Sequence, residues 1–394
     1  MPKPIKNSLW VVFFVLSVSC TKNVEVSKDQ ANYFLKYFGG SATDKAMDVK
    51  CCSDGGYALT GTMASVTNDS VAVFIKTDPY GNEVNFSPVL LGNGNKSIGY
   101  ALCQTSDGSF LVAGSVVASG RSDKDVLVVK INSDGSLAWT KTFGGTGDDE
   151  AYSVTELTTG EILVGGYTRS YGNGGKDAWG LLLDASGNKI WDKPYGFAGD
   201  DVGNYFMDKG SYFLMVGSTE SFQFAYLGRS VFLVKVDKVS GNAFDFVYYG
   251  GSGSESGVKA LIDSESSDIF VLANSVAASL SNIYLLRLKD DFHQVVWEKY
   301  TASANSEMGN DILLNNNQIV VVGSSTVNQN FDLLTDIFDT QGNLTNAGRN
   351  VLSAQGNQVA QAGAIATDGK LILAGSNVVD GFSKIMLAKI DFPR

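Results

Sequence analysis

The sequence predicts an all-β fold, a seven-bladed β-propeller built from four-stranded antiparallel blades. The first observation behind this prediction is a repeat, because seven apolar stretches each open on a small residue, at intervals of 53, 52, 52, 54, 52 and 51 residues. These markers are Ala46, Gly99, Ala151, Gly203, Gly257, Gly309 and Ala360. A period near fifty residues is typical of propeller blades. The second observation is composition: 44 Gly, 6 Pro and only 18% charged residues indicate short strands joined by tight turns.

The repeat at residues 151–196 shows how one blade is built. We expect strands at residues 151–157, 161–167, 177–183 and 189–193, each bounded by turn residues. A single meander of this kind cannot bury both of its faces. Seven meanders stacked radially bury them and leave only short, protected edges.

Two positions recur in most repeats. The second strand ends on glycine in six repeats and on Asn274 in the fifth, which we interpret as a corner with positive φ. An aromatic residue recurs in the fourth strand. It is Phe86, Trp139, Trp191, Phe246 or Trp297 in the first five repeats.

The two ends of the chain predict how the ring closes. The last repeat stops after its third strand, at residues 384–390. The segment 32–40 instead matches the fourth-strand segment 138–145, with Phe34 in the place of Trp139. We therefore expect residues 32–38 to complete the last blade, which makes residues 32–394 a single domain and removes an exposed sheet edge.

These motifs carry a family resemblance. The order Trp-x-Lys-x-Phe-Gly-Gly, an acidic residue, a small residue, Asp-Gly, an apolar run ending in Gly, and Asp-x-x-Gly resembles the SBBP and delta-60 repeats of exported bacterial proteins. The resemblance covers residues 32–394 and is best in the second and third repeats. It implies a seven-bladed propeller and no catalytic residues, because these families are defined by structural positions.

Residues 1–19 have the pattern of a signal peptide of the lipoprotein type. Lys3 and Lys6 precede an apolar run at residues 9–16, which is too short to span a bilayer. The run ends at Cys20, which resembles the lipidated cysteine of bacterial lipoproteins. We expect residues 20–31 to be a tether, and the protein to sit on the bacterial outer membrane or cell surface through this lipid anchor alone. The alternative is an ordinary signal peptide cut nearby.

Charge and cysteine content limit the other roles. The net charge of −11 argues against a nucleic-acid partner, since phosphate binding needs clustered Lys and Arg. Cys51, Cys52 and Cys103 are expected to be buried free thiols, with a disulfide between neighbouring repeats as the alternative. We expect a monomer without a cofactor.

Five carboxylates precede the markers by two residues. They are Asp44, Asp149, Asp201, Glu255 and Glu307. Propeller geometry places them around one mouth of the central channel, where they could bind a cation or a polyol. The alternative is that each one caps its own loop by accepting backbone N–H groups. Recurrence in nearly every blade favours the structural interpretation.

The loops between second and third strands differ from blade to blade. They carry arginines and aromatic residues, which are typical of protein-contact and glycan-binding surfaces. The candidates for this binding face are Arg121, Arg169, Tyr171, Phe222, Phe224, Tyr226 and Arg229. The alternative is that the aromatic side chains fold down over their blades.

Enzyme chemistry has little support in the sequence. His293 is the single histidine, which excludes multi-histidine zinc sites and disfavours a Ser-His-Asp triad. We therefore expect a non-catalytic scaffold for protein binding or assembly. The alternatives are a glycan-binding protein or carbohydrate-active enzyme that uses channel-face carboxylates, and a purely structural surface protein.

Overall fold

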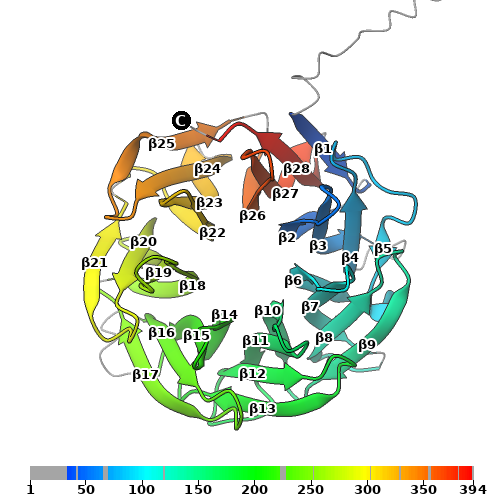
Figure 1. Ribbon diagram of the computed structural model, residues 1–394, viewed down its shortest axis with the longest axis horizontal. Coiled ribbons are helices and arrows are strands. Elements are labelled where there is room, and N and C mark those ends of the chain that lie inside the picture. Colours follow the sequence, from blue (N-terminus) through cyan, green and yellow to red (C-terminus); the bar gives the residue numbers. More distant parts are fainter. Residues whose placement is uncertain are drawn as a thin grey trace, which may run out of the picture.

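The computed structural model describes residues 33–40, 43–64, 70–118, 120–221, 228–251, 253–301, 303–327, 330–353, 356–379 and 381–392. Seven four-stranded antiparallel sheets stand around a central axis as the blades of a propeller (Figure 1). The predicted fold class is confirmed. In the third repeat the strand predicted at residues 177–183 has those bounds, and the other three differ by one or two residues at their ends.

The strands fall into four concentric sets. The inner strands are β2 (Lys45–Cys51), β6 (Ser97–Gln104), β10 (Asp149–Glu156), β14 (Asp201–Asp208), β18 (Ser254–Ile262), β22 (Glu307–Asn315) and β26 (Gln358–Ile365). The second strands are β3 (Tyr57–Ala64), β7 (Phe110–Val117), β11 (Ile162–Thr168), β15 (Phe213–Thr219), β19 (Ile269–Ala277), β23 (Gln318–Val327) and β27 (Leu371–Val379).

The third strands are β4 (Ser70–Thr77), β8 (Lys124–Ile131), β12 (Asp177–Leu183), β16 (Ser230–Val236), β20 (Leu280–Leu288), β24 (Asn330–Asp339) and β28 (Phe382–Ile390). The outer strands are β5 (Val89–Leu90), β9 (Leu137–Phe143), β13 (Lys189–Tyr195), β17 (Ala243–Tyr249), β21 (Val295–Tyr300), β25 (Leu344–Leu352) and β1 (Phe34–Phe38). A short 3₁₀ turn, η2 (Gly92–Gly94), follows β5.

The ring closes between the two ends of the chain. β1 pairs antiparallel with β28, from Phe34 opposite Lys389 to Phe38 opposite Ile385. The last blade therefore has the order β1-β28-β27-β26, as the sequence predicted. Figure 1 shows β1 beside β28, with the C-terminal end of the described chain close by.

The hydrophobic core is divided among the junctions between blades. In one such layer Leu111 and Val128 of blade two pack with Val164 and Leu181 of blade three, and all four are buried. Similar layers lie at the other junctions. Because its two neighbours together cover both faces of each blade, the apolar residues on either face of the second and third strands are buried.

A repeated contact, which we call the latch, joins the outer strand of one blade to the turn of the next blade. An aromatic ring of the outer strand lies on the turn glycine, so closely that a Cβ on this glycine would lie between 2.2 and 3.0 Å from the ring. The pairs are Phe34–Gly81, Phe86–Gly135, Trp139–Gly187, Trp191–Gly241 and Trp297–Gly342. Phe34 thus occupies the position equivalent to Trp139, which extends the latch across the closing blade.

The latch corrects two details of the sequence prediction. Blades two, three and five carry tryptophan at one position of the outer strand. In blade four this position, opposite Lys235, is occupied by Asp245 rather than by Phe246. Asp245 accepts hydrogen bonds from His293 and Lys235, and buried Phe292 fills the space. In blade one the outer strand is only Val89–Leu90, so Phe86 acts from the preceding turn.

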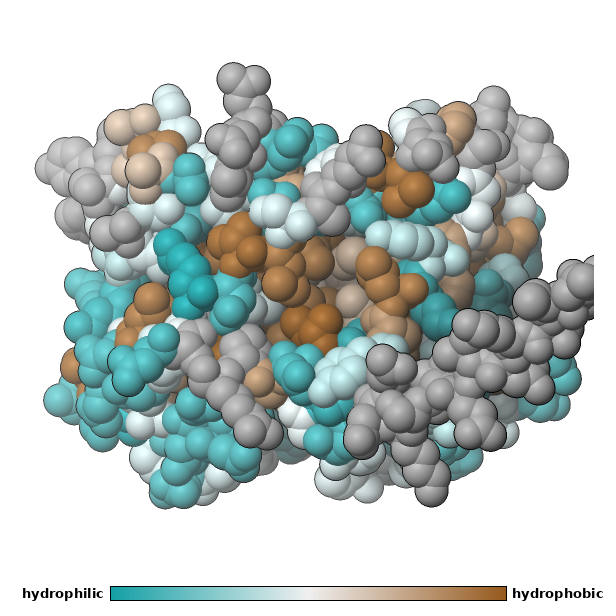
Figure 2. Space-filling view, turned by 90° about the horizontal axis from the view of Figure 1, so that it is seen from above, coloured by the Kyte–Doolittle hydropathy of each residue, from teal (hydrophilic) through white to brown (hydrophobic). Residues whose placement is uncertain are grey.

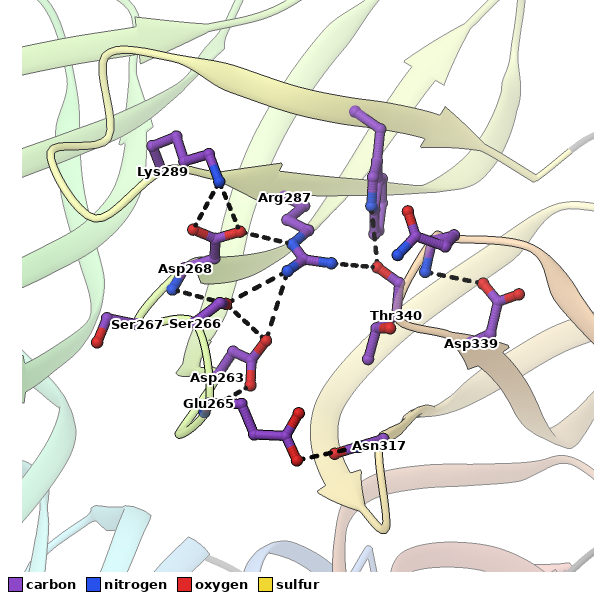
Figure 3. A network of polar contacts seen from close by, with 12 residues as sticks. Asp263, Glu265, Ser266, Ser267, Asp268, Arg287, Lys289, Asn317, Asp339 and Thr340 are labelled. Carbon is purple, nitrogen blue, oxygen red and sulfur yellow. Dashed lines mark hydrogen bonds and ion pairs between the residues drawn. The ribbon is translucent and has the colours of Figure 1, made fainter.

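Polar side chains add a second tie at the junction of blades five and six (Figure 3). Arg287 of β20 donates to Asp268, 2.8 Å away in the first turn of its own blade, and to the Thr340 carbonyl of blade six at 2.9 Å. Trp297 Nε1 donates to the same carbonyl at 3.1 Å. This guanidinium neutralises buried Asp268 while it connects the two blades.

The second-strand glycines have a different cause from the one predicted. None of the six has a positive φ. A Cβ on Gly166 would instead lie 1.9 Å from the Glu150 carbonyl oxygen, and the other five have equally close contacts. In blade five the residue opposite the marker Gly257 is Ala273. Asn274 bonds the backbone of Gly309 in blade six through its side-chain amide.

Candidate functional site

Every inner strand carries a β-bulge directly after its marker residue. A bulge inserts one residue without a partner and re-aims its side chain. The inserted residues are Met47, Tyr100, Tyr152, Asn204, Val258, Asn310 and Gln361. All seven line one cavity of about 440 Å³ in the central channel, and we call them the bulge ring.

The bulge ring explains why the opposite second-strand residue is glycine. The bulge pushes the carbonyl before the marker toward the second strand, as the Glu150 carbonyl against Gly166 illustrates. In six blades a side chain there would collide with this carbonyl oxygen. Blade five has Ala273 opposite its marker and still forms the bulge that presents Val258, so the glycine accompanies the bulge in six of the seven blades.

The residue after each bulge ties neighbouring blades together in three places. Asp48 Oδ2 accepts from Leu102 N at 2.9 Å, Ser153 Oγ from Phe206 N at 3.1 Å, and Asp311 Oδ2 from Gly363 N at 3.0 Å.

The other oxygens of the two channel aspartates are also engaged. Asp48 Oδ1 contacts Lys50 and Val49 N, and Asp311 Oδ1 contacts Lys259 and Ile312 N. The carboxylates of the channel wall thus serve the junctions between blades, and each is paired with a lysine.

The channel cavity continues into a smaller hollow at its mouth. This hollow measures about 220 Å³ and shares Tyr152 and Asn204 with the channel. Lys176, Asp200 and Arg229 form part of its wall. It lies over blades three, four and five, so the mouth is asymmetric although the fold repeats.

Glu150 organises the tyrosines at this mouth. It is buried, and it accepts from Lys124 Nζ at 2.7 Å and from the Tyr167 hydroxyl at 2.9 Å. Burial alone would raise the pKa of Glu150, but these donors outweigh it and hold the pKa below its usual value.

The hydroxyls around Glu150 are fixed as donors. Burial and the nearby Glu150 charge raise the pKa of Tyr100, Tyr152 and Tyr167 well above the usual value. Tyr100 and Tyr152 meet edge to face, with ring centroids 4.9 Å apart. The result is a rigid aromatic wall that keeps its hydroxyl protons at any physiological pH.

Lys176 forms the outer side of this wall. Its ammonium lies 4.0 Å from the centroid of the Tyr167 ring. Burial, aided by the neighbouring Arg169, lowers the pKa of Lys176.

The five predicted carboxylates do not face the channel. They are at most 1% exposed. Asp149 accepts from Gly145 N at 3.0 Å and from Ser170 Oγ at 2.6 Å, while Asp44 accepts from Gly40 N and Ala64 N.

The remaining three are engaged in similar ways. Asp201 accepts from Phe197 N and Ser221 Oγ, both at 2.8 Å. Glu255 accepts from Gly253 N and Ser275 Oγ, and Glu307 pairs with Arg349. The loop-capping interpretation describes the contacts of Asp44, Asp149, Asp201 and Glu255, which accept backbone N–H groups, whereas Glu307 forms an ion pair.

The predicted binding-face residues separate into two groups. Arg229 lines the small hollow and pairs with Glu220 at 2.7 Å, and Arg169 pairs at 3.4 Å with Asp200, which also lines it. Arg121 pairs with Asp123 and Asp125 at the junction of blades two and three. Tyr171 belongs to the same junction, where its hydroxyl donates to the Gly144 carbonyl and its ring packs on Trp179.

Four predicted residues lie outside the described residues. They are Cys20, Phe222, Phe224 and Tyr226. Cys51, Cys52 and Cys103 are free thiols in the structure. Burial raises the pKa of these thiols to about 11, 12 and 11, so they are protonated at neutral pH.

Sequence reasoning missed the bulge ring. A signal was present, because the residue after each marker varies in type while the marker itself stays small. Strict alternation along a strand assigns this residue to a blade face, and only the bulge turns it into the channel.

A second exposed surface lies on the rim of the ring. The side that carries β25, β28 and β1 has hydrophobic side chains gathered between hydrophilic ends (Figure 2). Leu35, Leu344 and Leu352 are 53%, 48% and 40% exposed there. On β17, Phe244 and Tyr248 are also exposed.

No described helix is long and apolar enough to cross a membrane. No group of three or more His, Cys, Asp or Glu side chains converges within the described residues in a way that could hold a metal ion.

Comparison with known proteins supports the fold. No family model matches the chain. The regulatory protein FlaEY of Caulobacter vibrioides is 28% identical over 201 residues, which are 45% of this chain and 20% of that protein. The chain thus spans about a fifth of the length of that relative.

Three solved structures have the same overall shape. Raptor of Chaetomium thermophilum has a TM-score of 0.58 at 11% identity, with 92% of this chain and 30% of that one covered. The hydrazine synthase of Kuenenia stuttgartiensis has 0.55 at 11%, covering 86% and 94%. The propeller domain of the Trilobed protease of Pyrococcus furiosus has 0.51 at 9%, covering 89% and 94%.

Proposed function

We propose that this protein is a non-catalytic binding scaffold, tethered to the bacterial envelope through a lipid on Cys20, and that a protein partner docks at the channel mouth over blades three to five. The propeller fold is one that commonly serves as a protein-binding scaffold. The bulge ring carries the proposal, because a repeated backbone feature turns seven side chains of five residue types into one cavity.

The chemistry of the mouth supports binding rather than catalysis. A glycosidase needs one carboxylic acid that donates a proton and a second carboxylate nearby. In the channel, Asp48 and Asp311 are each saturated by a lysine and backbone amides. A binding site needs polar and aromatic side chains at its wall instead, and Tyr152, Asn204 and Lys176 supply them around the hollow.

The tether and the export pathway are part of the same proposal. The pattern of residues 1–20 and the resemblance to SBBP and delta-60 repeats support an exported lipoprotein on the outer membrane or cell surface. Radiolabelled fatty acid should be incorporated into the full chain, and the Cys20→Ala variant should not incorporate it. Labelling of both, or of neither, would contradict this part.

A second candidate is glycan binding in the channel. It is favoured by the edge-to-face Tyr100–Tyr152 wall beside Asn204, since aromatic faces with amide groups suit sugar rings. A glycan needs the cavity itself, whereas a protein partner needs the rim of the mouth.

The test uses the mature chain as bait against envelope extract and against a glycan array. We expect wild type to retain a protein that Tyr152→Ala loses, and Gln361→Ala to retain it as well. Gln361 is the matched control, because it belongs to the bulge ring but comes from blade seven. Binding to glycans alone would replace the proposal with the second candidate, and equal capture by all three proteins would overturn it.

A further inference from the structure

The corner at each of three successive junctions between blades is built in the same way. The outer strand of one blade ends in a glycine that lies over the side chain opening a third strand and over the acid opening the next inner strand. The pairs of side chains are Asp125 with Asp149, Asp177 with Asp201, and Ser230 with Glu255.

The glycine brings the two side chains to one small space. A Cβ on Gly196 would lie 2.6 Å from Asp177 Oδ1 and 2.5 Å from Asp201 Oδ2. A Cβ on Gly172, which has a φ of +104°, would lie 2.3 Å from Asp177 Oδ2. The chain therefore uses glycine on both sides of this pair, where any larger residue would displace a carboxylate.

The three junctions differ in how they neutralise charge. At the first, Arg121 donates to Asp125 at 2.8 Å. At the third, serine replaces one acid. At the middle junction both acids are present, and neither forms an ion pair within the described residues.

The middle pair also has unused oxygen atoms. Asp177 is 1% and Asp201 0% exposed. Asp177 Oδ1 and Asp201 Oδ1 are buried and accept no hydrogen bond, whereas their other oxygens accept from Asn173 N and Phe197 N. Two adjacent buried carboxylates without a compensating charge are unfavourable, and a bound cation would remove this cost.

We propose that Asp177 and Asp201 form a site for a divalent cation, Ca²⁺ in particular, at the junction of blades three and four. Ca²⁺ prefers carboxylate and backbone carbonyl oxygens, and the glycine-rich segments 172–175 and 196–199 lie beside the pair. With only two carboxylates among its ligands, the site should bind weakly, with a dissociation constant of about 10⁻⁴ to 10⁻³ M, as in extracellular modules.

The site would act on the channel mouth. Lys176 precedes Asp177, Asp200 precedes Asp201, and Lys176 N donates to Asp200 Oδ1 at 2.9 Å. Both neighbours line the small hollow. A cation on the aspartate pair would therefore fix the segments that form its wall. This inference stands on the junction alone and does not require the proposed function.

Terbium luminescence gives a direct test. Tb³⁺ replaces Ca²⁺ in oxygen sites, and Trp179, two residues along β12 from Asp177 and in ring contact with Tyr171, is placed to sensitise it. We expect saturable Tb³⁺ emission from the full mature chain, displaced by Ca²⁺. We expect Asp177→Asn to weaken the affinity by at least about tenfold, a loss of 1.4 kcal/mol. The matched control Asp125→Asn should keep it, because Arg121 serves that junction.

Thermal unfolding with EDTA or with Ca²⁺ distinguishes two ways of neutralising the Asp177–Asp201 pair, namely a bound cation and a shared proton. We expect Ca²⁺ to raise the melting temperature of wild type and of Asp125→Asn but not of Asp177→Asn. Asp177→Ser, which copies Ser230, gives a second variant if the amide fails to fold. Tb³⁺ emission that Asp177→Asn leaves unchanged would overturn the proposal. So would a wild-type melting temperature that depends on pH but not on Ca²⁺, because the aspartate pair would then share a proton instead of binding a cation.

Discussion

The latch on the outside of the ring and the bulge ring on its inside are both repeated features, but they repeat in different ways. The latch repeats the residue types: an aromatic ring on a turn glycine, from Phe34–Gly81 to Trp297–Gly342. The bulge ring repeats only the backbone, while its side chains range from Val258 to Tyr152. The latch thus keeps residue types constant at the outside of the ring, whereas the bulge ring keeps the backbone constant and lets the side chains in the channel vary.

The largest expected effect comes from removing the latch at the closing blade. Deletion of residues 21–40 removes β1, leaves the β28 edge unpaired and takes Phe34 away from Gly81. We expect insoluble or unfolded protein, because an open edge is a template for aggregation. Soluble fraction and cooperative melting are the measurements.

Deletion of residues 21–32 is the control, since it retains β1. A soluble, cooperatively melting 21–40 deletion would show that the ring does not depend on this closure.

A single latch should cost less than the closure but more than a surface change. Trp191→Ala removes a ring that is 8% exposed and that donates from Nε1 to the Lys238 carbonyl. We expect a loss of about 3–5 kcal/mol in the free energy of unfolding, measured by denaturant titration. Ile190→Ala, next to it on β13 but 48% exposed, is the control. Equal losses of unfolding free energy in the two variants would show that the latch does not stabilise the fold.

The smallest loss of stability is expected in blade four, where Asp245 with its polar contacts stands in place of the aromatic ring. Burial alone would raise the pKa of Asp245, but hydrogen bonds from His293 and Lys235 lower it. An acid with a lowered pKa contributes stability above its unfolded pKa, about 3.9, and this contribution is lost as the pH falls through the folded pKa. Asp245→Asn should therefore cost about 0.5–1 kcal/mol at neutral pH. The difference from wild type should shrink below pH 4 in pH-dependent denaturation, and a constant difference would contradict it.

The sequence predicts the outside of this molecule better than its inside, for physical reasons. The latch needs an aromatic residue at a fixed place, so the sequence alone matched Phe34 to Trp139. This match predicted that residues 32–38 complete the last blade. In the segment Phe244-Asp245-Phe246, spacing alone assigned Phe246 to the latch position, which Asp245 occupies. The bulges were hidden, because the glycine that permits them serves close backbone approach rather than positive φ.

The candidate site illustrates the same limit. The five acids before the markers were found by their recurrence, and the structure buries them at or just before the start of the inner strands, where they do not line the channel cavity. Asp177 and Asp201 come from different blades, so their spacing along the chain does not predict that they pair. It also does not predict that their junction lacks a counterpart of Arg121, which pairs with Asp125.

The closure through β1 also determines where mechanical force enters the fold. Any pull along the N-terminal segment reaches β1 first, and β1 is held on both sides. Lys36 donates to Asn82 of blade one, and Asn377 of blade seven donates to the Tyr37 hydroxyl. A load on the N-terminal segment is thus divided between blade one and blade seven, so the strand that closes the ring is also held against being pulled out of it.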